Sequence, residues 1–99
     1  MRVIWTPQAQ VRLAQIHDYI AKDQPRNADR FIDRVTQRGD RVGNHPYAGR
    51  MVPEYRQEDL REVFAGAYRI IYRILVDRVD VITVRHGSRL LPEEAEELS

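Results

Sequence analysis

The chain has 99 residues, a length that suits one domain built around one core. Hydrophobic residues make up 42% of it, which excludes a disordered chain, and no apolar run approaches the roughly 20 residues that span a bilayer. The absence of cysteine excludes a disulfide framework and a thiolate metal site. The first residues meet charge and proline too soon for a signal peptide. We therefore expect a single domain, residues 1–99, that works in the cytoplasm.

The net charge of +1 is unevenly distributed along the chain. Residues 1–50 contain nine Arg or Lys and five Asp or Glu, whereas residues 51–99 contain seven and ten. Four of those acids lie within residues 90–99, which we expect to form an acidic C-terminal tail. Fifteen of the sixteen basic residues are Arg, a bias that suits bidentate pairing with phosphates or carboxylates but also follows from a GC-rich genome.

The first half of the chain predicts a short strand and two helices. Residues 2–5 are β-branched and aromatic enough for a strand, and Thr6 before a proline is typical of a helix N-cap. Apolar residues at helical spacing continue this helix to about Ala21. Pro25 opens a second helix, which Gly43 ends. Helices joined by so few residues form an antiparallel hairpin.

The second half predicts a sheet. Residues 45–59 lack a clear period and predict a loop, whereas residues 60–65 alternate and meet Gly66, the start of a two-residue hairpin turn. A central strand over residues 68–75 and a last strand over residues 79–85 follow. The predicted fold class is therefore α+β: an N-terminal strand, an antiparallel two-helix hairpin and a three-stranded antiparallel meander.

The central strand predicts two different faces for this sheet. Tyr68 and Tyr72 alternate with Arg69 and Arg73, and successive side chains of a strand point to opposite faces. The tyrosines are therefore expected under the helices, while the arginines lie on a partly exposed face.

The hairpin turn also predicts the register of the two strands. A two-residue turn pairs Phe64 with Arg69 and Glu62 with Ile71, so that Glu62 lies diagonal to Arg69 and Arg73. Such a glutamate could act as a base beside a phosphate clamp. The simpler interpretation is a ladder of Glu–Arg ion pairs on an exposed sheet face.

Five short motifs are spread over nearly the whole chain: Trp5-Thr6-Pro7, Pro46-Tyr47-Ala48-Gly49-Arg50, Leu60-Arg61-Glu62, Tyr68-Arg69-Ile70-Ile71-Tyr72 and Val84-Arg85-His86-Gly87-Ser88-Arg89. In this order and spacing they resemble the RelE/ParE superfamily of toxins from type II toxin–antitoxin systems. The superfamily has two branches that share one fold, so the fold alone does not decide the function. RelE-like toxins cut mRNA on the ribosome, whereas ParE-like toxins poison DNA gyrase.

RNA cleavage without a metal needs a base, stabilisation of the phosphorane and a proton donor. Arg69 stands where RelE-like enzymes carry an arginine that contacts the scissile phosphate. Glu62, His86 and Arg89 complete the candidate nuclease residues, although a His before Gly at a strand end is also common as a turn residue that bonds the backbone. Three scattered histidines make a poor metal site.

Two departures weigh against the RelE-like branch. That branch carries lysines where this chain has Leu60 and Glu62, and a glutamate there would repel the phosphate. It also places a tyrosine or a similar donor after the last strand, where residues 90–92 offer none. The resemblance therefore favours the ParE-like branch, with no catalytic residue, metal or cofactor assigned. A third interpretation is an inactive family member that acts only as a binding module.

The resemblance also implies partners. A ribbon-helix-helix, ParD-like antitoxin would wrap an extended segment around the toxin and carry the complex to promoter DNA, and DNA gyrase would be the target. No membrane partner is expected. Glu93 to Glu97 are hypothesised to contact a basic partner surface or the toxin's own arginines. The candidate antitoxin-binding residues are Arg30, Arg34, Arg38, Arg41, Arg69 and Arg73.

Overall fold

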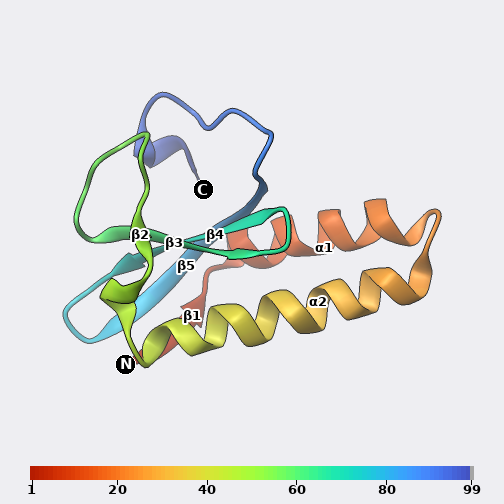
Figure 1. Ribbon diagram of the computed structural model, residues 1–99, viewed down its shortest axis with the longest axis horizontal. Helices are drawn as coiled ribbons and strands as arrows, with labels where there is room; N and C mark the ends of the chain where they lie inside the picture. Colours follow the sequence, from red (N-terminus) through yellow and green to blue (C-terminus); the bar gives the residue numbers. More distant parts are fainter. Residues whose placement is uncertain (99) are drawn as a thin grey trace.

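The computed structural model describes residues 1–98 as an α+β domain, which confirms the predicted fold class (Figure 1). Two helices and a mixed sheet make up most of it, and no helix among residues 1–98 is long and apolar enough to cross a membrane. The elements in chain order are β1 (Arg2–Trp5), α1 (Pro7–Ala21), α2 (Pro25–Asp40), the 3-10 helices η1 (Arg41–Gly43) and η2 (Pro46–Ala48), β2 (Arg50–Met51), β3 (Leu60–Ala65), β4 (Tyr68–Ile74), β5 (Arg78–His86) and η3 (Ala95–Leu98).

Local sequence accounts for the helix ends. The Thr6 hydroxyl accepts a hydrogen bond from the Ala9 N–H at 3.1 Å, so Thr6 caps α1 as predicted. Pro25 is the first residue of α2, which ends at Asp40 and continues as the tighter turn η1 up to the predicted stop. The ends of both helices were therefore predictable to within a few residues.

The five strands form one sheet in the order β1-β5-β4-β3-β2. β3, β4 and β5 make the predicted antiparallel meander, whereas β1 pairs in parallel with residues 78–81 of β5. The two-residue strand β2, within the predicted loop, adds an edge beside β3. The parallel pairing of β1 matters for function, because it brings α1 alongside β5.

The predicted hairpin register is confirmed. Phe64 pairs with Arg69 and Glu62 with Ile71. Gly66 has a φ of +58° at the first central position of the turn, where a type II′ turn takes glycine. Glu62 is thereby placed beside Arg69 on the same face of the sheet.

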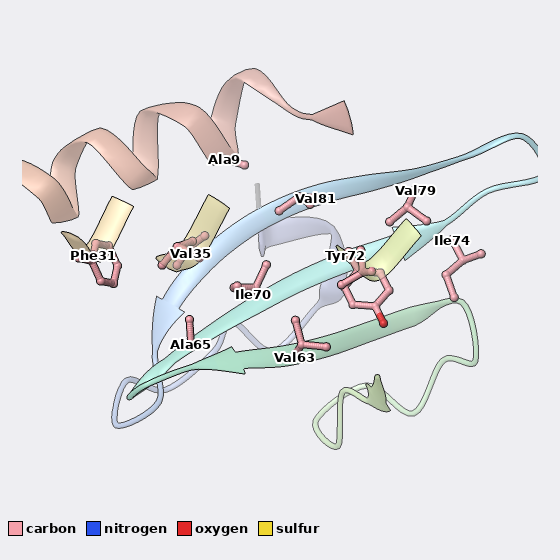
Figure 2. Close-up of a cluster of buried hydrophobic side chains, with 12 residues drawn as sticks. Ala9, Phe31, Val35, Val63, Ala65, Ile70, Tyr72, Ile74, Val79 and Val81 are labelled. Carbon is pink, nitrogen blue, oxygen red and sulfur yellow. The ribbon is translucent and has the colours of Figure 1, made fainter. Parts of the chain in front are cut away.

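The main core lies between the helices and one face of the sheet. Figure 2 shows side chains of β3, β4 and β5 meeting Phe31 and Val35 of α2. Tyr72 is fully buried there, and its hydroxyl donates to the Pro46 carbonyl at 2.6 Å. The Tyr68 ring meets the Phe31 ring edge-on, with 4.7 Å between centroids. The prediction that both tyrosines pack under the helices is confirmed.

Other segments of the chain cover much of the opposite face of the sheet, which stays partly exposed as predicted, since Phe64, opposite Arg69 on that face, is 43% exposed. The segment after β2 and the C-terminal segment lie on the side away from the helices (Figure 1). We call this the tail-covered face. The Tyr55 hydroxyl donates to the Pro92 carbonyl at 2.6 Å and ties the two segments together. They bury a second core cluster of Val52, Leu60, Ile71, Ala95 and Leu98.

Candidate functional site

Four charged side chains on the tail-covered face form one chain of ion pairs, which we call the charged network. Glu62 of β3 accepts hydrogen bonds from Arg69 Nε at its Oε1 and from Arg50 Nε at its Oε2, both at 2.5 Å. Arg69 Nη1 and Nη2 donate to the two carboxylate oxygens of Glu54 at 2.7 and 2.8 Å. The guanidinium of Arg69 is therefore held between two carboxylates, one of them bidentate.

Burial makes this pairing strong. Glu62 is 1% exposed and Arg69 is 5% exposed, and every guanidinium nitrogen of Arg69 already donates to a carboxylate. The bonds to Glu54, together with those to Glu62, raise the pKa of Arg69 above its ordinary value. The same bonds lower the pKa of the Glu54 carboxyl below its ordinary value. Three of the five N–H donors of Arg69 are thus used, and at 5% exposure the side chain gives a phosphate little access to the other two unless the network opens.

The predicted ion-pair ladder is thus present in part and in different surroundings. Glu62 pairs with Arg69 but is buried rather than exposed, because the segment from Val52 to Asp59 crosses this face. Arg73, also expected beside Glu62, donates to Asp59 at 2.7 Å. Glu54 was missed, and its only signal was a carboxylate between the apolar residues Val52 and Tyr55.

A pocket of about 630 Å³ lies between α1 and the end of β5. Arg12 of α1 faces Arg85 and His86 of β5 across it, and Arg89 follows from the turn after β5. Arg85 also donates to the Leu98 carbonyl at 2.8 Å. Burial, with Arg12 nearby, lowers the pKa of Arg85 below its ordinary value. We call this feature the basic pocket.

His86 has a fixed orientation in the basic pocket. Its Nδ1 accepts a hydrogen bond from the Ser88 backbone N–H at 3.1 Å and lies 2.7 Å from the Ser88 hydroxyl. Because a backbone N–H can only donate, the proton of the neutral ring is on Nε2. The ring also packs edge-on against Tyr68, 5.0 Å between centroids. The arrangement fits the turn role and makes Nε2 a hydrogen-bond donor.

The structure does not bring the four candidate nuclease residues together. Glu62 and Arg69 belong to the charged network on the tail-covered face. His86 and Arg89 line the basic pocket, beside α1. No three His, Asp or Glu side chains among residues 1–98 come together in a group that could hold a metal ion.

The candidate antitoxin-binding residues also divide into two sets. Arg30, Arg34 and Arg41 are exposed on or directly after α2, and Arg38 is half-buried. Arg69 is enclosed in the charged network. These six assignments stay predictions. Arg12 and Arg85 were missed as site residues, because nothing in the sequence shows that α1 lies beside β5.

Comparison with known proteins gives a family by sequence and a solved structure with the same fold. Residues 3–91 match the family described as ParE toxin of type II toxin-antitoxin system, parDE. The chain is 34% identical over 94 residues to "Putative toxin Y4kP" of Sinorhizobium fredii, covering 93% of this chain and 94% of that protein. It is 27% identical over 85 residues to "Toxin RelE3" of Caulobacter vibrioides, covering 82% and 88%.

A solved structure, the chromosomal ParDE TA system from P. aeruginosa, contains a chain with the same fold. Its TM-score is 0.75 at 15% identity, over 87% of this chain and 95% of that one. Fold and sequence together define a toxin of the RelE/ParE superfamily. Within it, the chain belongs to the ParE toxin family of type II toxin–antitoxin systems.

Proposed function

We propose that the chain arrests growth by inhibiting DNA gyrase, and that a cognate ParD-like antitoxin neutralises it. The observation that carries this choice is the enclosure of Arg69 between Glu54 and Glu62. A ribonuclease of this superfamily needs that arginine at the scissile phosphate, whereas a toxin that acts by binding a protein does not.

The energetic argument supports the same choice. Removing one partner from a buried ion pair costs about 3–5 kcal/mol, because the other charge stays buried without a partner. A domain of this size has a total free energy of unfolding of only about 5–15 kcal/mol. Freeing Arg69 for a phosphate would therefore use a large part of the stability of the fold.

The geometry of the other nuclease candidates adds support. Glu62, the candidate base, is tied to Arg50 and Arg69 on the tail-covered face, whereas His86 and Arg89 line the basic pocket. His86 presents a donor rather than an acceptor to the basic pocket, so it is not set up to remove a proton. The observations that favour the second candidate function, mRNA cleavage, are the basic pocket itself and the similarity to a protein named RelE3.

The family supports an antitoxin as the physiological partner. We propose a ribbon-helix-helix protein that covers the toxin and brings the complex to promoter DNA. Because gyrase and the promoter are cytoplasmic, so is the proposed site of action. The exposed arginines of α2 and the basic pocket both suit an acidic partner.

The test is a gyrase assay with the purified chain. Gyrase, ATP and relaxed plasmid are incubated with increasing chain, and supercoiling and trapped cleavage complexes are followed on gels. Dose-dependent loss of supercoiling, with linear plasmid after protein digestion, is the expected result. A parallel reaction contains programmed ribosomes and labelled mRNA. Full gyrase activity together with ribosome-dependent mRNA cuts would overturn the proposal and establish the second candidate.

A further inference from the structure

The basic pocket contains positive charge that the rest of the molecule leaves uncompensated. Arg12, Arg85 and Arg89 line it with His86, and no lining residue is acidic. Within residues 1–98, no carboxylate lies within ion-pair distance of these three arginines. Four other arginines of the sheet, Arg50, Arg69, Arg73 and Arg78, are each paired with at least one carboxylate. The unmatched charge therefore points to an anionic ligand.

The groups in the basic pocket are arranged as donors. Two guanidinium groups and the Nε2–H of His86 are available, since the Nδ1 of His86 is taken by Ser88. Arg85 is partly engaged, because it donates to Thr83 and to the Leu98 carbonyl. Guanidinium groups suit carboxylate or phosphate oxygens, so charge alone does not choose between them.

The apolar surroundings of the basic pocket favour the carboxylate of a protein partner over a phosphate. Ile16 and Val84 line its inner wall, and the rim contains Tyr19, 72% exposed, and Leu90, 95% exposed. Farther along the same side of α1, Val11 is also exposed and lines a shallower hollow that shares Arg12. Arginine and tyrosine are enriched at protein interfaces, where neighbouring apolar groups add buried area. Tyr68, the one aromatic ring at the inner end, is packed against Phe31 and His86 and is not free to stack on a base.

We propose that the basic pocket binds a carboxylate side chain from an acidic, amphipathic segment of a protein partner. Its apolar side chains cover Tyr19, Leu90 and Val11, and its carboxylate lies between Arg12 and Arg89. Identifying this partner as the antitoxin rests on the proposed function above. The inference places an antitoxin contact on α1 and the end of β5, in addition to the predicted arginines of α2.

The first test uses defined probes. A fluorescein-labelled peptide with three repeats of Glu-Leu-Glu-Ala is titrated with three proteins. They are the full chain, a double variant of the basic pocket, Arg12→Gln and Arg89→Gln, and a matched control variant at exposed arginines outside it, Arg26→Gln and Arg56→Gln. Both variants lose two positive charges. We expect the pocket variant to bind at least tenfold more weakly and the control variant to change by less than twofold. A peptide with Gln in place of Glu should bind the native chain at least tenfold more weakly.

Three results would overturn the inference. One is no binding of the glutamate peptide to the native chain, and another is equal binding to all three proteins. The third is tighter binding of a labelled single-stranded dT8 that is lost in the pocket variant, which would make the occupant a nucleic acid. None of these measurements involves gyrase, so a failure of the gyrase assay leaves them unaffected.

A second test concerns the identity of the partner. The antitoxin that relieves growth arrest on co-expression is purified, and its affinity for the same three proteins is measured. We expect the pocket variant to bind it at least tenfold more weakly than the native chain. Equal affinities would show that the antitoxin does not occupy the basic pocket, while leaving gyrase inhibition standing.

Discussion

Arg69 of the charged network and the arginines of the basic pocket share one chemistry and have opposite surroundings. Arg69 is 5% exposed and lies between the carboxylates of Glu54 and Glu62. Arg12 and Arg89 line an open pocket without any acidic lining residue. A compensated arginine holds segments of the fold together, whereas an uncompensated one remains available to a partner. In this family member the neighbouring carboxylates, rather than the arginines themselves, distinguish the two roles.

The largest expected effect comes from breaking the charged network. Glu62→Gln leaves Arg69 buried with one charged partner fewer, and we expect the free energy of unfolding to fall by about 3–5 kcal/mol. Denaturant unfolding followed by circular dichroism measures it. The matched control is Asp59→Asn, which removes the partner of the half-buried Arg73 and should cost less than about 1 kcal/mol. Equal losses in the two variants would contradict the role assigned to burial.

The next effect concerns the segment that covers the charged network. Leu98 is 1% exposed in the second core cluster, so Leu98→Ala should lower the free energy of unfolding by about 2–4 kcal/mol. Leu90→Ala, at a position 95% exposed, is the control and should change it by less than about 0.5 kcal/mol. If Leu98→Ala were as neutral as the control, the C-terminal segment would not cover this face in solution. Deleting residues 93–99 would remove Leu98 too, so it tests stability along with the hypothesis on the acidic tail.

Substitutions in the basic pocket, unlike those in the charged network, should leave the stability of the fold unchanged. Because Arg12 and Arg89 have no acidic partner within residues 1–98, replacing both with Gln breaks no ion pair described there. We expect the free energy of unfolding to change by less than about 0.5 kcal/mol, by the same denaturation assay. A loss above about 1 kcal/mol would mean that these arginines stabilise the fold, as Arg69 does.

The smallest effect concerns an exposed charge pair between the two helices. His17 Nε2 lies 2.9 Å from Asp29 Oδ1, and hydrogen bonds to Asp29 and Asp18 raise the pKa of His17 above its ordinary value of 6.5. A raised pKa in the folded state stabilises the protein below pH 6.5, and this stabilisation is lost as the pH rises through the folded pKa. The melting temperature should therefore exceed that of His17→Gln by more at pH 5.5 than at pH 8.5. Asp29→Asn should reduce that difference, and an unchanged difference in this variant would assign the effect to another group.

The packing of the sheet face that lies against the helices was predictable from the sequence, because its signals are local. Alternation along β4 placed Tyr68 and Tyr72 in the main core, and Gly66 fixed the turn and so the pairing of Glu62. Caps and prolines fixed the starts of both helices. Each of these features depends on residues close together in the chain.

The tail-covered face and the basic pocket depend on contacts between distant segments. The apolar residues that cover the charged network, such as Val52 and Leu98, stand singly among charged neighbours and follow no period. Arg12 and Arg89 line one pocket only because β1 pairs in parallel with β5 and brings α1 alongside it. The sequence therefore indicated the pairing of Arg69 with Glu62, but neither the second carboxylate, from Glu54, nor the basic pocket that Arg12 and Arg89 line.

The most direct test of the account replaces the buried pair of the charged network with apolar residues. In a double variant, Glu62→Met and Arg69→Met, no buried charge is left unpaired, and such replacements are often neutral or stabilising. Its folding is checked by circular dichroism and melting, and its inhibition of gyrase supercoiling is compared with that of the native chain. We expect a folded variant that inhibits gyrase as the native chain does, because Arg69 supports the fold and takes no part in chemistry. A folded variant that has lost its inhibition of gyrase, or a native chain that cuts ribosome-bound mRNA when this variant does not, would contradict the account.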